Sequence, residues 1–381
     1  MEIRNAEVVL TNPGRNYVVV RLETADGLVG WGDATLNGRE KAVEAALTGH
    51  LFPEIEGMDA HRVEDIWQDL YRGTYWRGGP VLQSALSGVD MALWDLKGKA
   101  AGLPVHDLLG GRTREYATVY DHCGDDSIDA IVANATDALD RGIDHFRVNV
   151  GDPMGDYLDL DGVVDGVLEV RDRLGPDPEL IVDVHSRATP REARQIAQGL
   201  EPAELFFLED PLAPEHDAEY DALRSATTTP IAYGELATGP FALQPLIEAG
   251  SIDFVRVDLA HVGGITAARK LATVAEGNGI ETAFHGPPDL SPIGQAATVH
   301  LDLALPHFGV QELTDYEERY GDAVGEVFEG GASFDESVGG LVVPDEPGLG
   351  IDVDLDAAES FEYERSHLPK RRAEDGSVAD W

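Results

Sequence analysis

From residue 116 onward, short apolar runs alternate with stretches of helical periodicity. Helical patterns such as 190–199 and 265–276 separate the runs. The runs are almost continuously apolar, which is typical of parallel strands buried on both faces. This alternation predicts an α/β fold with a parallel (β/α) barrel of seven or eight units, of TIM type, rather than a doubly wound sheet. The strand candidates are residues 117–122, 145–150, 180–185, 205–209, 231–235, 254–259, 282–285 and 309–312.

The first part of the chain has a different pattern. Residues 16–24 read as a strand, Ala25-Asp26-Gly27 suits a hairpin turn, and residues 28–32 return. Helical periodicity follows at 40–50, 63–71 and 81–101. An antiparallel sheet followed by helices predicts a small α+β domain ahead of the barrel.

Three regions follow from these patterns. We predict an α+β capping domain over 1–112 and the barrel, with the site residues, over 113–333. Residues 334–381 are rich in Gly, Pro and Asp. We predict that this segment completes the capping domain and packs back on it and on the active site.

Three acidic residues are spaced evenly along the predicted barrel. Asp183, Glu209 and Glu235 are each 26 residues apart, and each ends an apolar run. The carboxyl ends of barrel strands converge on one mouth, where catalysis takes place. Three hard oxygen ligands at one point suit Mg²⁺. The alternative, three solvated acids in a very acidic chain, does not account for their common register.

The charge balance is extreme. The chain of 381 residues has 71 acids against 28 bases, a formal net charge of −43, and the acids are dispersed. Such a charge disfavours nucleic-acid binding, which depends on basic patches. It is typical of a protein from a halophile with a high-salt cytoplasm, where self-repulsion is screened.

Cysteine use and hydropathy point to the compartment. Cys123 is the only cysteine, so an intrachain disulfide is excluded. The first residues carry acids where a signal peptide would be basic and then apolar. No apolar stretch approaches the length of a membrane span. We expect a cytoplasmic enzyme with no membrane partner.

Several motifs together resemble one family. They are LNGRE at 36–40, YWRGGP at 75–80, GVDMALWD at 88–95, DVH at 183–185, HGPPDLSP at 285–292, and the tail from Leu368 to Trp381. With Asp, Glu and Glu ending the third, fourth and fifth strands, the chain resembles the enolase superfamily, with its mandelate racemase/muconate lactonizing enzyme-type fold. Within it the chain is similar to the mannonate dehydratase family of sugar-acid dehydratases, as a divergent member.

The resemblance implies an active site. Asp183, Glu209 and Glu235 would bind Mg²⁺, which would stabilise the enediolate formed when the C2 proton of a sugar acid is removed. The C3 hydroxyl then leaves, giving a 2-keto-3-deoxy acid. The positions matching residues that contact substrate or shape the pocket are Asn37, Trp76, His122, Arg147, Arg256, Asp289, Glu312 and Trp381.

Three groups are candidates for moving protons. His185 lies two residues beyond Asp183, on the same face of a strand, and would protonate the leaving hydroxyl. Asp258 and His285 end adjacent strands, so the carboxylate could orient the imidazole as the C2 base. By the family resemblance, Tyr157 with Arg147 is the third candidate, but the loop before Tyr157 is short.

The choice of base bears on the substrate. By the family resemblance, an Asp258–His285 pair implies an R centre at C2, which makes D-gluconate the best candidate and D-galactonate or D-mannonate further ones. The alternatives are a D-mannonate-specific dehydratase using Tyr157 and Arg147, a racemase or epimerase with bases on both faces of C2, and a metal-binding paralogue with little activity. The resemblance also implies a homo-oligomer: a dimer, tetramer or octamer.

Overall fold

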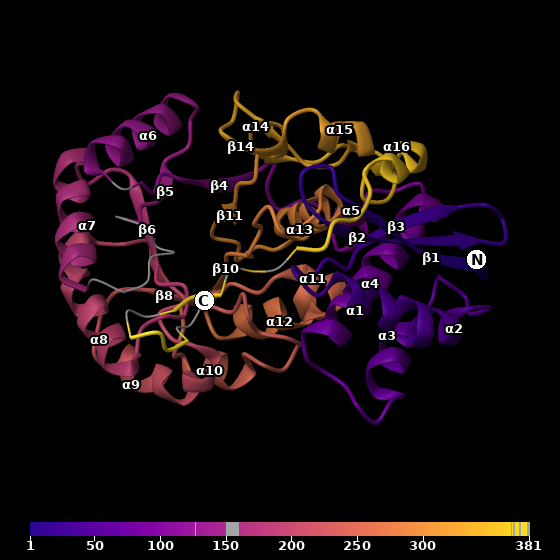
Figure 1. Ribbon diagram of the computed structural model, residues 1–381, viewed down its shortest axis with the longest axis horizontal. Coiled ribbons are helices and arrows are strands. Elements are labelled where there is room, and N and C mark those ends of the chain that lie inside the picture. The colour runs from indigo at the N-terminus through magenta and orange to yellow at the C-terminus, as the bar shows by residue number, and fades with distance from the viewer. Residues whose placement is uncertain (126, 150–159, 367, 369, 373–374, 379–381) are drawn as a thin grey trace.

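The computed structural model describes residues 1–125, 127–149, 160–366, 368, 370–372 and 375–378. The capping domain lies at one end of the molecule and the barrel at the other (Figure 1). Within the described part of the chain, no helix is both long and apolar enough to cross a bilayer.

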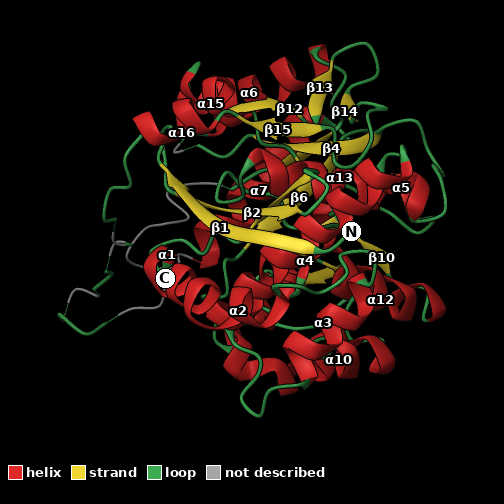
Figure 2. Ribbon diagram, turned by 90° about the vertical axis from the view of Figure 1, so that its right-hand side faces the viewer, coloured by secondary structure: helices red, strands yellow, loops and turns green. Residues whose placement is uncertain are grey.

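The capping domain begins with a three-stranded antiparallel sheet in the order β1-β2-β3, which faces the viewer in Figure 2. The strands are β1 (Ile3–Thr11), β2 (Tyr17–Thr24) and β3 (Val29–Asp33). The predicted hairpin is confirmed, whereas β1 was not predicted. The sheet can pack closely on the helix that contains Gly88 because Gly32 has no side chain. A Cβ on Gly32 would lie 1.9 Å from the Gly88 carbonyl oxygen.

Helices complete the capping domain. The predicted helix over 40–50 is interrupted by a π-helical turn at Leu47–Leu51. The α-helices are α1 (Glu40–Ala46), α2 (Phe52–Ile55), α3 (Val63–Arg72), α4 (Pro80–Ala101) and α5 (Val105–Leu108).

All eight predicted barrel strands are present. The first strand spans the predicted residues 117–122, whereas the other seven are shorter than their apolar runs. The strands predicted to end at residues 150, 185, 235, 259 and 285 end earlier. They are β4 (Ala117–His122), β5 (His145–Arg147), β6 (Glu179–Asp183), β7 (Phe207–Glu209), β8 (Ile231–Tyr233), β9 (Phe254–Val255), β10 (Glu281–Thr282) and β11 (Gln311–Glu312).

The strands pair in parallel in chain order from β4 to β10, and β11 pairs with β4. A bridge between Thr282 and Phe308 closes the ring. Buried side chains from around the ring fill its interior, including Tyr120, Ile181 and Phe207. The barrel is therefore a packed core whose chemistry is confined to its ends.

The barrel helices are α6 (Ile128–Asp140), α7 (Leu160–Leu174), α8 (Pro190–Gly199), α9 (Tyr220–Arg224), α10 (Gln244–Ala249), α11 (Leu259–Val262), α12 (Gly264–Gly277) and α13 (Pro292–Ala304), with 3₁₀ turns at Glu201–Ala203 and Pro214–Glu219. Helices α6 to α10 form the outer arc in Figure 1, whereas α11, α12 and α13 lie on the side of the capping domain.

The chain after the barrel touches both domains. Strand β14 extends the barrel sheet by pairing antiparallel with β4. Strand β12 lies before residue 334, where the C-terminal segment was predicted to begin, and pairs with β15, which lies after it. The Asp352 carboxylate accepts from Trp31 Nε1 at 2.6 Å. The elements are α14 (Tyr316–Tyr320), α15 (Ala323–Val327), β12 (Phe328–Gly330), β13 (Ser333–Asp335), β14 (Gly340–Val342), β15 (Ile351–Val353) and α16 (Leu355–Ser360).

Helix α4 joins the two domains through hydrogen bonds to the end of α11 and the first turn of α12. Gln83 Nε2 donates to the Val262 carbonyl at 3.1 Å. The Gly263 N–H donates to Ser87 Oγ at 3.0 Å, and the Thr266 N–H donates to Asp90 Oδ2 at 2.9 Å. This segment follows Asp258, so the capping domain helps to fix one side of the barrel mouth.

Candidate active site

The three predicted metal ligands lie at one end of three neighbouring strands. Asp183 and Glu209 end β6 and β7 and are paired in register, while Glu235 follows β8 by two residues. Their exposed fractions are 6%, 0% and 9%. The parallel register therefore places these acids side by side at the mouth, which the spacing predicted.

Each of these acids faces a basic side chain. Asp183 Oδ2 lies 2.8 Å from His185 Nδ1 and 3.2 Å from Arg147 Nη1. Glu235 Oε2 lies 3.4 Å from His285 Nε2. The third acid, Glu209, accepts from Arg256 Nε through Oε1. Cationic groups thus compensate the buried carboxylates, as buried charges require.

The donor set fits a divalent cation. Glu209 Oε2 is buried and has no hydrogen-bond partner. Burial, moderated by Arg256 and reinforced by Asp183, raises the pKa of Glu209 to about 7. Among the described residues, no group of three or more His, Cys, Asp or Glu side chains stands in a ready coordination geometry. To coordinate a cation together, the three carboxylates would have to rotate away from their basic partners.

Arg256 is the centre of a second group of polar side chains inside the barrel. It is fully buried, and its Nη2 lies 2.5 Å from Tyr120 Oη and 2.7 Å from Glu312 Oε2. Glu312 Oε1 lies 2.9 Å from His122 Nε2, and His122 Nδ1 lies 3.0 Å from Arg147 Nη2. The structure thus brings together four predicted residues in one continuous network.

His285 and Asp258 also meet. His285 Nδ1 lies 3.0 Å from Asp258 Oδ2, and the two residues form a parallel bridge. Asp258 does not lie within a strand as predicted; it caps α11, accepting the Ala260 N–H at 2.6 Å. Burial alone would lower the pKa of His285, but Glu235, Asp258 and Glu312 raise it to about 10.

His185 reaches Asp183 by a route that strand alternation does not provide. β6 ends at Asp183, and His185 and Ser186 have φ of 56° and 59°, in the left-handed region. The turn bends the imidazole back toward Asp183. That carboxylate raises the pKa of His185 to about 9 despite burial. His185 does lie beside Asp183, as predicted, but the predicted reason, side-chain alternation along a strand, was wrong.

The capping domain contributes Asn37 to the mouth. Asn37 Nδ2 donates to Asp289 Oδ2 at 3.0 Å, joining two predicted substrate residues across the domains. Arg15, which the sequence analysis missed, donates to Asp289 Oδ1. Asn149 was also missed; its amide exchanges two hydrogen bonds with the backbone of Asp183, at 3.1 and 3.2 Å. These partners hold the Asp289 carboxylate and the backbone of Asp183 in place.

One predicted residue among the described ones does not join this group. Trp76 lies on the loop after α3 with an exposed fraction of 79%, and its ring contacts Tyr75 at 5.3 Å between centroids. Tyr157 and Trp381 lie outside the described residues.

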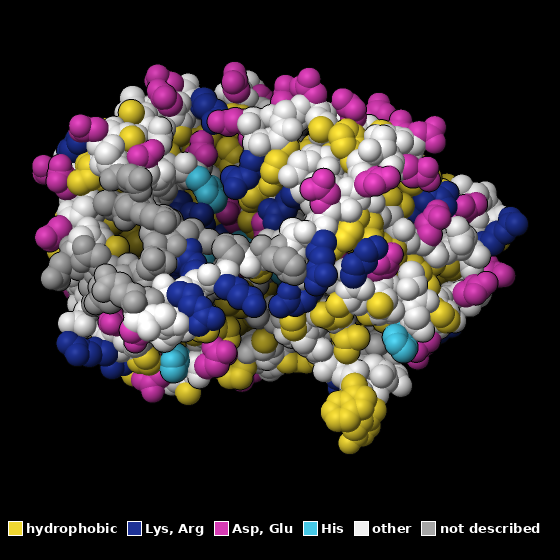
Figure 3. Space-filling model, in the orientation of Figure 1, with side chains coloured by type: hydrophobic (Ala, Val, Ile, Leu, Met, Phe, Trp, Pro, Cys, Tyr) yellow, Lys and Arg dark blue, Asp and Glu magenta, His cyan; other side chains and the backbone are white. Residues whose placement is uncertain are grey.

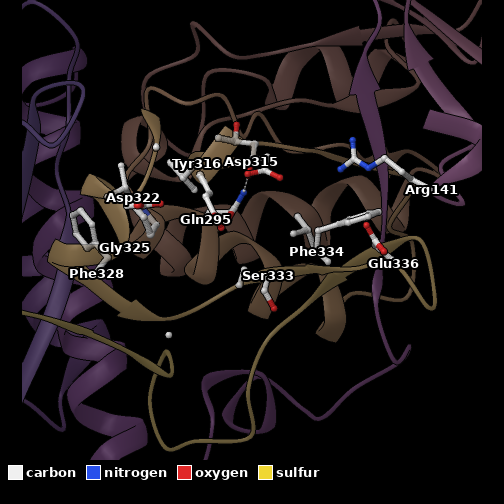
Figure 4. Close-up of a pocket in the computed structure, with 18 residues that line it drawn as sticks. Arg141, Gln295, Asp315, Tyr316, Asp322, Gly325, Phe328, Ser333, Phe334 and Glu336 are labelled. Atoms are coloured by element: carbon white, nitrogen blue, oxygen red, sulfur yellow. Dashed lines mark hydrogen bonds between the residues drawn. The ribbon is translucent and has the colours of Figure 1, made fainter. Parts of the chain in front are cut away.

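Two cavities lie beside the mouth rather than on the acids. One of about 680 Å³ has Arg141, Phe334 and Glu336 at one end and Asp322 and Phe328 at the other (Figure 4). A smaller one of about 280 Å³ is lined by residues that include His122 and Asp121. Arg141, Thr314 and Asp315 line both, so the smaller cavity connects the His122 side of the site with the larger one.

Comparison with known proteins identifies the class. The family model of the mandelate racemase / muconate lactonizing enzyme N-terminal domain matches residues 7–110, and the enolase C-terminal domain-like model matches residues 130–358. With its barrel, capping domain and acids at successive strand ends, the chain belongs to the enolase superfamily. Within it, the chain belongs with the sugar-acid dehydratases, which are hydro-lyases.

Three relatives support this placement. A D-mannonate dehydratase from Caulobacter vibrioides is 40% identical, and a D-galactonate dehydratase family member from Halomonas elongata is 39% identical, each over the whole of both chains. An enolase from Pantoea ananatis, solved with bound D-gluconate and Mg, has a TM-score of 0.94 and 39% identity over 99% of both chains.

Proposed function

We propose that this protein dehydrates a six-carbon aldonate, with D-gluconate as the best candidate. A proton is removed from C2 and the hydroxyl is lost from C3, which amounts to loss of water. The resulting enol tautomerises to a 2-keto-3-deoxy acid. The observation that carries the proposal is the His285–Asp258 pair, with the second ring nitrogen of His285 facing Glu235.

The pair suits a general base. His285 acts as a base in its neutral form, which a cation held by Glu235 would favour by offsetting the charge of that carboxylate. In this form Nδ1–H donates to Asp258, and the lone pair for accepting a proton is on Nε2. Nε2 is the atom that lies 3.4 Å from Glu235, at the mouth. The buried carboxylate orients the ring and stabilises the imidazolium formed after proton transfer.

The second imidazole suits the other half of the reaction. His185 contacts Asp183 and His285 contacts Glu235, and these are the first and last of the three acids. The two imidazoles therefore contact different acids of the group. This arrangement provides one group for the C2 proton and another, His185, to protonate the departing C3 hydroxyl.

The acids suit a resident Mg²⁺. Asp183, Glu209 and Glu235 would hold it through carboxylate oxygens, and bound Mg²⁺ would offset the negative charge that develops on the substrate carboxylate. Basic side chains gather across the middle of the face shown in Figure 3, although acids dominate its edge. That local concentration favours an anionic substrate in a chain of charge −43.

The residue that acts as the base determines which C2 epimer of the aldonate is dehydrated. A base at His285 favours the R centre at C2 of gluconate, and the similar structure from Pantoea ananatis contains D-gluconate. D-mannonate dehydration with Tyr157 and Arg147 is the second candidate because several relatives carry that name. D-galactonate is a further substrate of the same C2 configuration as gluconate.

A substrate screen tests the proposal. The protein is assayed with D-gluconate, D-mannonate and D-galactonate in Mg²⁺ and high KCl, with detection of 2-keto-3-deoxy products. His285→Asn should abolish gluconate dehydration, whereas Tyr157→Phe should leave it nearly intact. Full gluconate activity in His285→Asn would assign the base to Tyr157.

Two other outcomes identify the remaining alternatives. Failure to convert any sugar acid would indicate a metal-binding paralogue. Solvent deuterium at C2 of recovered substrate, without dehydration, would indicate a racemase or epimerase.

A further inference from the structure

Asp258 has a second imidazole beside it that the proposed mechanism does not use. His261 Nε2 lies 3.7 Å from Asp258 Oδ2, the oxygen that also meets His285 Nδ1 at 3.0 Å. The other oxygen, Oδ1, accepts the Ala260 N–H. The carboxylate is fully buried, and the side chain of His261 is 17% exposed. The two imidazoles thus approach one oxygen from two sides.

Ser84 connects this group to the capping domain. Its Oγ lies 2.9 Å from His261 Nδ1, and the serine is fully buried on α4. A hydroxyl that donates to Nδ1 leaves the ring proton on Nε2, which faces Asp258. The order of contacts is therefore Ser84, His261, Asp258 and His285, running from the capping domain into the barrel mouth.

The surrounding contacts hold this arrangement in place. Gln83 and Ser87, on either side of Ser84, bond the backbone of Val262 and Gly263. Trp67 Nε1 donates to the Gly263 carbonyl at 2.8 Å. Hydrogen bonds thus hold the turn after His261 against the capping domain, and Ser84 contacts the imidazole of His261.

We propose that His261 and Ser84 are positioning residues, which hold the Asp258 carboxylate in the orientation that directs His285. This proposal rests on the proposed function, because it assigns His285 as the base. His261 directs a ring N–H toward Oδ2 and keeps the carboxylate plane from turning about its Cβ–Cγ bond. Ser84 selects the tautomer of His261, so the capping domain controls the alignment of a base in the barrel.

The physical argument concerns a buried carboxylate with limited support. An ionised buried carboxylate needs several donors to keep one orientation. Asp258 has a backbone donor on Oδ1 and two imidazoles near Oδ2. His261 Nε2, at 3.7 Å, lies beyond hydrogen-bond length from Oδ2 but close enough for a polar attraction, which removal of His261 would take away. A small error in the alignment of the base lowers the catalytic rate strongly but changes the affinity for substrate little.

Matched variants test the role of His261. His261→Gln keeps an N–H donor near the position of Nε2, whereas His261→Leu removes it. We expect His261→Leu to lower kcat by about 10- to 100-fold, part of the usual contribution of a general base. We expect KM to change by less than about 3-fold, and His261→Gln to recover most of kcat. Equal loss in both variants would overturn the proposal.

Ser84→Ala and Ser87→Ala separate positioning from packing. Both serines are buried on α4 and bond the same segment, but Ser84 alone of the two contacts His261. Ser84→Ala should lower kcat by about 3- to 10-fold and should add little to His261→Leu, because coupled residues are not additive. Ser87→Ala should reduce stability and lower kcat much less than Ser84→Ala, because Ser87 bonds the Gly263 backbone and not the imidazole. Equal kcat losses for the two serines would refute the positioning role.

A spectroscopic measurement is independent of turnover. In protein labelled with ¹⁵N-histidine, the His285 ring signals are identified by their loss in His285→Asn. We expect His261→Leu and Ser84→Ala to shift the His285 Nδ1 signal, and His261→Gln and Ser87→Ala to leave it close to the original. An unchanged signal in all four variants would contradict the proposal. Absence of any dehydration by the parent protein would instead count against the proposed function alone.

Discussion

Arg256 and Glu312 form an ion pair inside the barrel, with Nη2 2.7 Å from Oε2 and both side chains shielded from water. The same guanidinium also contacts Glu209. Replacing Arg256 by Met would leave two buried carboxylates without their main cation. We expect a loss of about 3–5 kcal/mol in the free energy of unfolding, measured by urea denaturation.

A surface ion pair provides the control for Arg256→Met. Arg194 lies 3.6 Å from Glu219, with exposed fractions of 35% and 47%. Arg194→Met should change the free energy of unfolding by less than about 1 kcal/mol. Similar losses for both variants would mean that burial does not determine the contribution of Arg256.

The carboxylate of Asp258 can be tested without removing its capping role. In Asp258→Asn, the amide oxygen can still accept the Ala260 N–H, so α11 should remain capped. An amide in place of the carboxylate no longer stabilises the His285 imidazolium. We expect kcat on D-gluconate to fall by about 10²- to 10⁴-fold with little change in melting temperature. Retention of kcat would show that His285 needs no charged partner.

Asp90 should make stability depend on pH. Burial raises the pKa of Asp90 to about 7, even though the Thr266 N–H donates to it. The folded chain therefore keeps a proton that the unfolded chain loses above about pH 4, so this contribution to stability is present at low pH and lost as pH rises toward 7. Asp90→Asn should stabilise the protein by roughly 1–3 kcal/mol at pH 8 and have little effect at pH 4.

The measurement for Asp90 is a pair of unfolding curves at each pH. Asp137→Asn, on the exposed face of α6, removes the same charge and serves as the control. Asp137→Asn should not raise the free energy of unfolding at pH 8 by a comparable amount. A variant Asp90→Asn that is less stable than the parent at pH 8 would mean that the carboxylate is ionised and well solvated there.

The barrel was predictable because its strands are buried on both faces and separated by helices. Each predicted apolar run from β4 to β11 overlaps the observed strand, and β6 and β10 begin one residue earlier than predicted. Strand ends were less predictable, since hydrogen bonding stops at Asp183 although the apolar run continues. β1, in which Arg4 and Asn5 follow Ile3, and the short strands β12 to β15 lacked a strong pattern. Their pairing comes from tertiary contacts that local sequence does not encode.

The site was predictable where strand register determines it. Parallel pairing brings Asp183 beside Glu209, so regular spacing was a sufficient signal. The turn at His185 needs φ near 56°, which side-chain alternation cannot reveal. His261 and Ser84 are 177 residues apart in sequence, and a polar residue on a helix is usually solvated. Only the packing of α4 on the barrel shows that these two side chains meet.

Salt should stabilise this chain through screening. At a net charge of −43, like-charge repulsion opposes the compact state. The screening length falls from about 10 Å at 0.1 M salt to about 3 Å at 1 M. We expect the melting temperature to rise steadily between 0.1 and 2 M KCl. Sucrose at matched osmolality controls for solute exclusion, and an equal rise in sucrose would remove screening as the cause.

Metal binding should stabilise the protein by mass action, and Glu235 tests which side chains are responsible. At a free Mg²⁺ concentration 100 times Kd, we expect about 2.7 kcal/mol of stabilisation. Glu235→Gln removes one carboxylate oxygen from the group and should weaken Mg²⁺ binding measured by calorimetry, whereas Glu248→Gln, on the exposed face of α10, should not. EDTA should abolish dehydration and added Mg²⁺ restore it. Undiminished binding by Glu235→Gln would place the cation elsewhere, because a site at the mouth depends on all three acids.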